Sequence, residues 1–118
     1  MLSLPLRRSL AAAGWWLFTV YLLLLKPAGT PSAIPHFDKL GHALLFAVWA
    51  WLLARSLAAR QRPPLRPTLW LCLGWALLSE LAQGSLTLTR SAEAGDVVAD
   101  MAGTLLVLYW LWRRGAAK

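Results

Sequence analysis

Four long apolar runs, separated by short polar segments, limit what this chain can fold into. The runs cover about residues 9–25, 38–57, 67–83 and 96–112. A helix rises about 1.5 Å per residue, and about 20 apolar residues cross the hydrocarbon core of a bilayer. The runs are therefore close to a membrane-spanning length. We predict an all-α fold: a single domain over residues 1–118 that forms an integral membrane four-helix bundle.

The composition agrees with a membrane protein and argues against a nucleic-acid partner. Hydrophobic residues make up 58% of the chain and charged residues 14%, whereas a soluble domain carries about 25% charged residues. The chain has eight Trp, a residue that collects at the lipid–water boundary. The formal net charge is +7, but the basic residues lie between apolar runs and form no soluble basic face. We therefore expect no nucleic-acid binding.

The beginning of the chain also resembles a signal peptide, because Arg7 and Arg8 precede the apolar run from Leu10 to Leu25. Counted from Ser9, however, this run spans about 26 Å as a helix, which is just enough to cross a membrane. Its length and flanks therefore favour a retained helix.

The distribution of basic residues predicts how the helices are oriented. With four crossings, nine basic residues fall on one side, and three fall on or near the other. Lys and Arg are enriched in cytoplasmic segments, so both termini are predicted to be cytoplasmic. The nine are Arg7, Arg8, Arg55, Arg60, Arg62, Arg66, Arg113, Arg114 and Lys118, and the three are Lys26, Lys39 and Arg90.

Polar side chains recur in pairs on three of the predicted helices. The pairs are Asp38 with His42, Glu80 with Gln83, and Asp96 with Asp100. In the first and last pairs the two residues are four apart, so they share one face of a helix. A charge near the centre of a bilayer costs about 2.5–3.5 kcal/mol on insertion scales. Because exposing each pair separately to lipid is costly, we predict that the three pairs meet.

The distance of these pairs from the basic ends of their helices predicts matching depths. His42, Glu80 and Asp100 lie 13, 14 and 13 residues from Arg55, Arg66 and Arg113, or about 20 Å along the helix axis. The other three members each lie 17 residues from the same arginines, or about 25 Å. This predicts two polar layers in the outer part of the membrane. Ionisable groups there are candidate functional residues, and the alternative is a polar clasp that only holds the helices together.

Small residues in the apolar runs predict where the helices pack closely, since they let two backbones approach. They are Gly41, Gly74, Ser79, Gly103 and Thr104. The single cysteine, Cys72, cannot form an intrachain disulfide and is interpreted as a small buried hydrophobic residue.

Residues at the ends of the runs predict helix caps and a surface ion pair. Asp38 is suited to cap the second helix, and Pro67 suits the first position of the third. In the polar segment before the fourth helix, Glu93 is predicted to pair with Arg90 at the surface.

Taken in order, the motifs resemble the VanZ-like family, which is named after an accessory protein of glycopeptide-antibiotic resistance. They are Asp38-Lys39-x-x-His42, Glu80-x-x-Gln83, Arg90 and Asp96-x-x-x-Asp100-x-x-Gly103. The resemblance covers about residues 38–106. It implies a small multi-pass protein of the bacterial inner membrane, linked to the cell envelope and, for the name-giving member, to teicoplanin resistance, but it implies no reaction. The chain departs from the family pattern at Asp100, where Asn is more usual, and at Leu106, near which a further Gly is expected.

The first functional hypothesis is an enzyme, a hydrolase or transferase, that acts on an envelope lipid phosphate or a lipid-linked glycan at the outer leaflet. His42 is the candidate general acid or base, because its unperturbed pKa is about 6.5. Glu80 or Asp100 supplies a second catalytic carboxylate. Arg90 and Lys39 are candidates for binding phosphate. The other predicted substrate-binding residues are Asp38, Gln83 and Asp96.

Two further hypotheses stay open. One is a non-catalytic membrane accessory protein that binds a lipid head group or another membrane protein. The other is a small proton-linked transporter, because acid–histidine chains serve as proton relays in membranes. The expected partners are membrane lipids and a lipid-linked cell-wall precursor. No cofactor is expected, although a divalent cation is a variant for which His42, Asp38, Glu80, Asp96 and Asp100 offer nitrogen and oxygen ligands.

Overall fold

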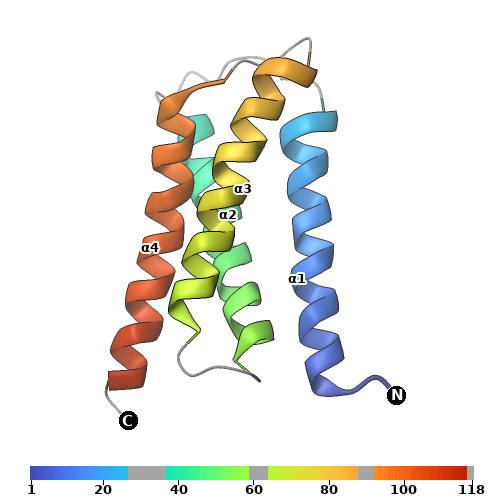
Figure 1. The fold of residues 1–118 in the computed structure, drawn as a ribbon, viewed down its shortest axis with the longest axis vertical. Coiled ribbons are helices and arrows are strands. Elements are labelled where there is room, and N and C mark those ends of the chain that lie inside the picture. The colour runs from blue at the N-terminus through green and yellow to red at the C-terminus, as the bar shows by residue number, and fades with distance from the viewer. Residues whose placement is uncertain (27–36, 59–63, 88–91, 117–118) are drawn as a thin grey trace.

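The computed structural model describes residues 1–26, 37–58, 64–87 and 92–116. Within these residues the chain is all-helical, as predicted, and four long helices form a bundle (Figure 1). The helices are α1 (Leu4–Val20), α2 (Phe37–Leu57), α3 (Leu65–Leu86) and α4 (Ala94–Ala116), and α1 continues into a π-helical turn, η1 (Tyr21–Leu25).

The helices extend beyond the predicted bounds for local reasons. α1 starts five residues earlier than predicted, because the side chain of Ser3 accepts a first-turn backbone N–H at 3.3 Å and Pro5 suits that turn. α3 starts at Leu65, so Pro67 is its third residue and not its first; the first-turn N–H groups have no acceptor within the helix, so Pro fits there. Asp38 lies inside the first turn of α2, where a carboxylate favours the positive end of the helix.

α2 and α3 occupy the middle of the bundle, between α1 and α4 (Figure 1). α2 packs most closely against α4, while α1 packs against α2 and, through η1, against α3. The helices run alternately up and down, so both termini lie at the same end of the bundle. The first turns of α2 and α4 therefore meet the last turns of η1 and α3 at the opposite end.

The contact between α2 and α4 depends on Gly103. A Cβ atom at this position would lie 2.0 Å from the backbone oxygen of Ala43, so α4 can approach α2 this closely only with glycine there. By contrast, no described atom of another element lies within 4 Å of a Cβ built at Gly41 or Gly74. The prediction of close packing is therefore wrong for these two glycines.

The interior of the bundle contains many polar side chains, whereas large apolar side chains lie on its outside. The buried polar side chains of the described residues are Thr19, His42, Thr68, Ser79, Glu80, Gln83, Asp96, Asp100 and Thr104. They accompany an apolar core built around Phe46, Trp49 and Cys72, the last of which is buried as predicted. Large apolar side chains on the outside are well exposed, including Leu81 at 64% and Leu106 at 71%. A water-soluble bundle normally has the opposite arrangement.

Three of the described helical segments are long and apolar enough to cross a membrane: Leu4–Leu25, Phe37–Leu57 and Ala94–Gly115. α3 is as long, with 22 residues, but is not among them. Its hydropathy is reduced by residues such as Arg66, Glu80 and Gln83, of which the last two are buried inside the bundle.

Candidate functional site

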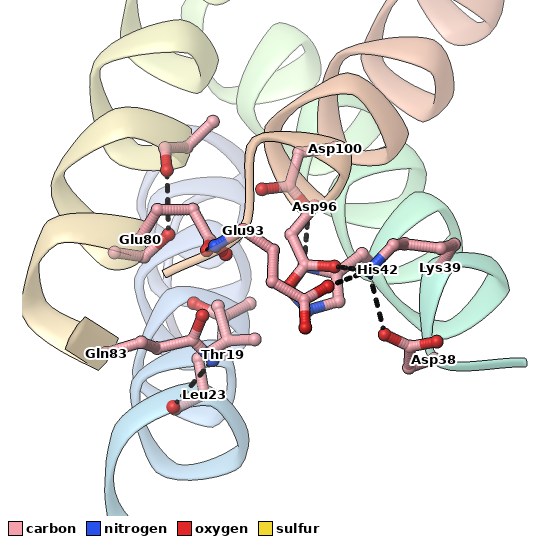
Figure 2. A network of polar contacts seen from close by, with 12 residues as sticks. Thr19, Leu23, Asp38, Lys39, His42, Glu80, Gln83, Glu93, Asp96 and Asp100 are labelled. Carbon is pink, nitrogen blue, oxygen red and sulfur yellow. Dashed lines mark hydrogen bonds and ion pairs between the residues drawn. The ribbon is translucent and has the colours of Figure 1, made fainter. Parts of the chain in front are cut away.

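A histidine and two carboxylates from three different helices meet at the end of the bundle away from the termini. His42 comes from α2, Glu80 from α3 and Asp100 from α4, and one possible ligand atom from each lies within 4.8 Å of the others. The residues are 7%, 5% and 0% exposed, respectively. The structure thus brings together the three residues that the sequence analysis assigned as catalytic (Figure 2).

The imidazole of His42 lies between two carboxylates of α4. Its Nδ1 is 2.8 Å from Oδ1 of Asp100, and its Nε2 is 3.5 Å from Oδ2 of Asp96. Asp96 and Asp100 are four residues apart, so one face of α4 presents both carboxylates to the ring. A carboxylate that is hydrogen-bonded to one ring nitrogen fixes the orientation of the imidazole and selects its tautomer. His42 is therefore held in one orientation.

Glu80 is held by a backbone group that the sequence analysis did not find. Its Oε2 accepts a hydrogen bond from the backbone N–H of Glu93, 2.9 Å away, just before α4 begins. Its Oε1 is buried and has no hydrogen-bond partner among the described residues, and the same holds for Oδ2 of Asp100. Buried polar atoms are almost always hydrogen-bonded, so two such carboxylate oxygens in one cluster need an explanation.

Lys39 forms ion pairs with a second group of carboxylates beside the cluster. Its Nζ lies 2.5 Å from Oδ1 of Asp96 and 3.0 Å from Oδ2 of Asp38, and it also contacts Oε2 of Glu93. Its side chain is 22% exposed. Because three carboxylates already surround this ammonium group, the geometry does not favour the predicted role of Lys39 in binding phosphate. Asp96 links the two groups, since its other oxygen faces His42.

The surface pair predicted for Glu93 involves Arg90, which lies outside the described residues. The described partner of the Glu93 side chain is Lys39. The predicted role of Arg90 in phosphate binding likewise falls on a residue that the structure does not describe.

Gln83 faces α1 and not the second polar layer that was predicted. Its Nε2 donates a hydrogen bond to the backbone oxygen of Leu23 in η1, 3.0 Å away (Figure 2). One turn earlier in α1, the buried hydroxyl of Thr19 accepts a hydrogen bond from Nε1 of Trp75 at 3.1 Å. Gln83 and Trp75 are both in α3, so these contacts fasten α1 to α3 beside the cluster. Thr19 is not among the residues predicted to form the site.

Two sets of side chains among the described residues have an arrangement that could hold a metal ion. The first is His42 with Glu80 and Asp100, and the second is Asp38 with Glu93 and Asp96. The ammonium group of Lys39 already lies against all three carboxylates of the second set. Among the described residues, no such cation lies against the first set, which combines an imidazole with carboxylates, the ligand types that divalent transition metals bind.

Comparison of the chain with protein-family models, with curated proteins and with solved structures finds no match.

Proposed function

We propose that this chain is a bacterial inner-membrane protein whose His42–Glu80–Asp100 cluster binds, and modifies by acid–base chemistry, the head group of an envelope lipid or lipid-linked glycan. The observation that carries the proposal is the meeting of these three side chains, from three helices, inside a bundle with an apolar exterior. Ionisable groups placed at such depth are costly, and they commonly mark functional sites in membrane proteins.

Membrane insertion is supported by the distribution of polarity. The three apolar segments are long and apolar enough for three crossings. We propose that α3 is the fourth, because its Glu80 and Gln83 are buried in the bundle while Leu78 and Leu81 face outward. The longest dimension of the chain, 44 Å, is close to the about 40–45 Å thickness of a bilayer with its head groups.

The proposed orientation places both termini in the cytoplasm and the cluster near the outer leaflet. The described arginines lie at the end of the bundle that holds the termini, and the cluster lies at the other end. Positively charged ends stay preferentially on the cytoplasmic side. The cluster would then face lipids and lipid-linked precursors on the outer side of the membrane.

The proposed chemistry assigns one task to each member of the cluster. His42 transfers a proton to or from the head group, and Asp100 holds the imidazole in position through the 2.8 Å contact. Glu80 is the second acid or base. A hydrolase or transferase that acts on a phosphate-linked head group needs these two roles. The resemblance of the motifs to the VanZ-like family supports a place in the cell envelope and an effect on teicoplanin susceptibility.

A second candidate is binding without turnover, which the depth of burial favours. The side chain of His42 is 8% exposed and that of Asp100 is 0% exposed, so access to the reacting atoms is narrow. A non-catalytic accessory protein would bind the same head group and alter antibiotic access to its target.

The experiment is photo-crosslinking of the full chain in membranes with a lipid probe that carries a phosphate head group, together with a teicoplanin susceptibility assay. We expect Glu80→Gln and His42→Gln to lose both lipid labelling and the phenotype. Arg113→Gln, which removes an exposed charge at the opposite end, should keep both. A His42→Gln variant that keeps the phenotype would support binding without turnover. Equal labelling of Glu80→Gln and wild type would refute the proposed site.

A further inference from the structure

Two buried carboxylate oxygens of the cluster have no hydrogen-bond donor among the described residues. They are Oε1 of Glu80 and Oδ2 of Asp100, and neither has a hydrogen-bond partner among the described residues. The other oxygen of each group is engaged, by the backbone N–H of Glu93 and by Nδ1 of His42. The free oxygens therefore belong to side chains that are already held in position, as ligand atoms are in a preformed site.

The described ammonium group beside the cluster, that of Lys39, makes no direct contact with them. Lys39 forms ion pairs with Asp38, Glu93 and Asp96. Among the described interactions, its Nζ contacts neither Glu80 nor Asp100. A protonated His42 compensates one carboxylate at most, while both Asp96 and Asp100 face its ring. Burying an uncompensated carboxylate is costly. Among the described residues, carboxylates of the cluster therefore outnumber the cations beside them, and added protons or an added cation would restore the balance.

The three side chains supply a suitable ligand set for a cation. Their ligand atoms lie within 4.8 Å of one another, and Nδ1 of His42 is 2.8 Å from Oδ1 of Asp100. Two ligands of one tetrahedral Zn²⁺ lie about 3.4 Å apart, so small changes in side-chain torsion are enough to close the set around an ion. One imidazole and two carboxylates leave a fourth position open, as in catalytic zinc sites with three protein ligands.

We propose that His42, Glu80 and Asp100 bind one divalent transition-metal ion, with Zn²⁺ as the preferred ion. This inference deepens the proposed function and rests on it for the purpose of the ion. With His42 and Glu80 as ligands, the ion would supply a Lewis acid at the phosphate of the head group, and a water bound to the ion would take over the proton transfer assigned to these two side chains. The backbone N–H of Glu93 orients Glu80 as a ligand, and Asp96 connects His42 to the Lys39 ion pairs. Such supporting contacts are typical of metal sites.

The first test is Zn²⁺ titration, by calorimetry, of the full chain purified in detergent without a histidine tag and stripped with a chelator. We expect one Zn²⁺ per chain, and an affinity at least about 100-fold weaker in Glu80→Gln and in Asp100→Asn. The control is Arg113→Gln, which removes an exposed charge at the opposite end of the bundle; its affinity should equal that of wild type. Absence of Zn²⁺ binding by wild type, or equal binding by Glu80→Gln and Asp100→Asn, would overturn the site.

The second test uses the unaltered chain, so it does not depend on whether a variant folds. Co²⁺ added to the stripped protein should give the visible absorption of a four- or five-coordinate site with nitrogen and oxygen ligands, and equimolar Zn²⁺ should remove that absorption. A spectrum identical to that of Co²⁺ in water would overturn the site. Zn²⁺ binding is measured without any lipid. If lipid labelling depends on Glu80 but Zn²⁺ does not bind, the metal site alone fails; if Zn²⁺ binds but labelling does not depend on Glu80, the proposed function alone fails.

Discussion

The two ends of the bundle carry opposite charges, which are mostly paired with other charges at one end and mostly exposed at the other. At one end, all five acidic side chains of the chain gather around His42 and Lys39, and most of them are tied to another charged group. At the other end, the described arginines are exposed or half-buried, and two of them lie over tryptophan rings: Arg55 over Trp51 at 4.6 Å and Arg114 over Trp110 at 4.8 Å.

The difference separates charges that build the buried cluster from charges that lie at the surface of the bundle. Side chains in the cluster have specific partners on other helices, so replacing one changes the packing or the electrostatic balance of its neighbours. The paired arginines have partners on their own helix, four residues away, and face the surroundings of the bundle. We therefore expect stability to depend strongly on the acidic end and weakly on the arginine end.

The largest effect is expected at Gly103, which holds α4 against α2 next to Asp100. In Gly103→Ala the added Cβ would lie 2.0 Å from the Ala43 oxygen, and the helices must separate, at a cost of about 3 kcal/mol or more. Gly74→Ala, where the space is open, should be neutral or stabilise by up to about 1 kcal/mol. Reversible unfolding in detergent measures both. Equal stabilities would show that α4 does not approach α2 so closely.

The next largest difference in unfolding free energy is expected between variants of a buried charge, Asp100, and variants of an exposed charge, Arg113. Asp100→Ala leaves His42 without its 2.8 Å partner and should lower the free energy of unfolding by about 3 kcal/mol. Arg113→Ala, at the arginine end, should change it by less than about 0.5 kcal/mol. Asp100→Asn keeps an acceptor oxygen near the imidazole, so its loss should lie between these two values. Thermal unfolding curves of the three variants decide the order, and a larger loss for Arg113→Ala than for Asp100→Ala would contradict the comparison.

The smallest changes in unfolding free energy are expected for two partly exposed cations, Lys39 at the acidic end and Arg55 at the arginine end. Lys39→Met leaves Asp38, Glu93 and Asp96 without their shared ammonium group and should cost about 1 kcal/mol, less at high salt. Arg55→Met removes a contact with Trp51 and should cost about 0.5 kcal/mol, with little dependence on salt. Unfolding at low and high ionic strength separates the two. The same salt dependence in both variants would mean that the Lys39 pairs contribute nothing.

The number of helices was predictable from the four apolar runs in the sequence. The meeting of His42, Glu80 and Asp100 was predictable from the rise of a helix. Equal spacing from Arg55, Arg66 and Arg113 puts His42, Glu80 and Asp100 at one level, whatever the order of the helices. The prediction for Gln83 was wrong because its distance from Arg66 along the helix gives its height but not the direction in which its side chain points. It lies three residues after Glu80, so it points about 60° away around the axis of α3, towards α1.

Other contacts of the site had no signal in the sequence. The donor to Glu80 is a backbone N–H, which every residue except proline has, so residue type could not identify it. Lys39 pairs with Glu93 and Asp96, which are 54 and 57 residues further along the chain, and only the order of the helices brings them together. Gly41, Gly74 and Gly103 look alike in sequence, yet only Gly103 of these three meets another helix within 4 Å.

Side chains from different helices meet in one buried cluster of the bundle, and we predict that they are energetically coupled. A double-mutant cycle on His42→Ala and Asp100→Ala, measured by reversible unfolding in lipid bilayers, tests it most directly. We predict a coupling energy of about 1–3 kcal/mol for this pair, and additive effects, within about 0.5 kcal/mol, for Arg55→Ala with Arg113→Ala at the other end. Additive effects for His42 and Asp100 would mean that the two side chains do not meet, and would contradict the account.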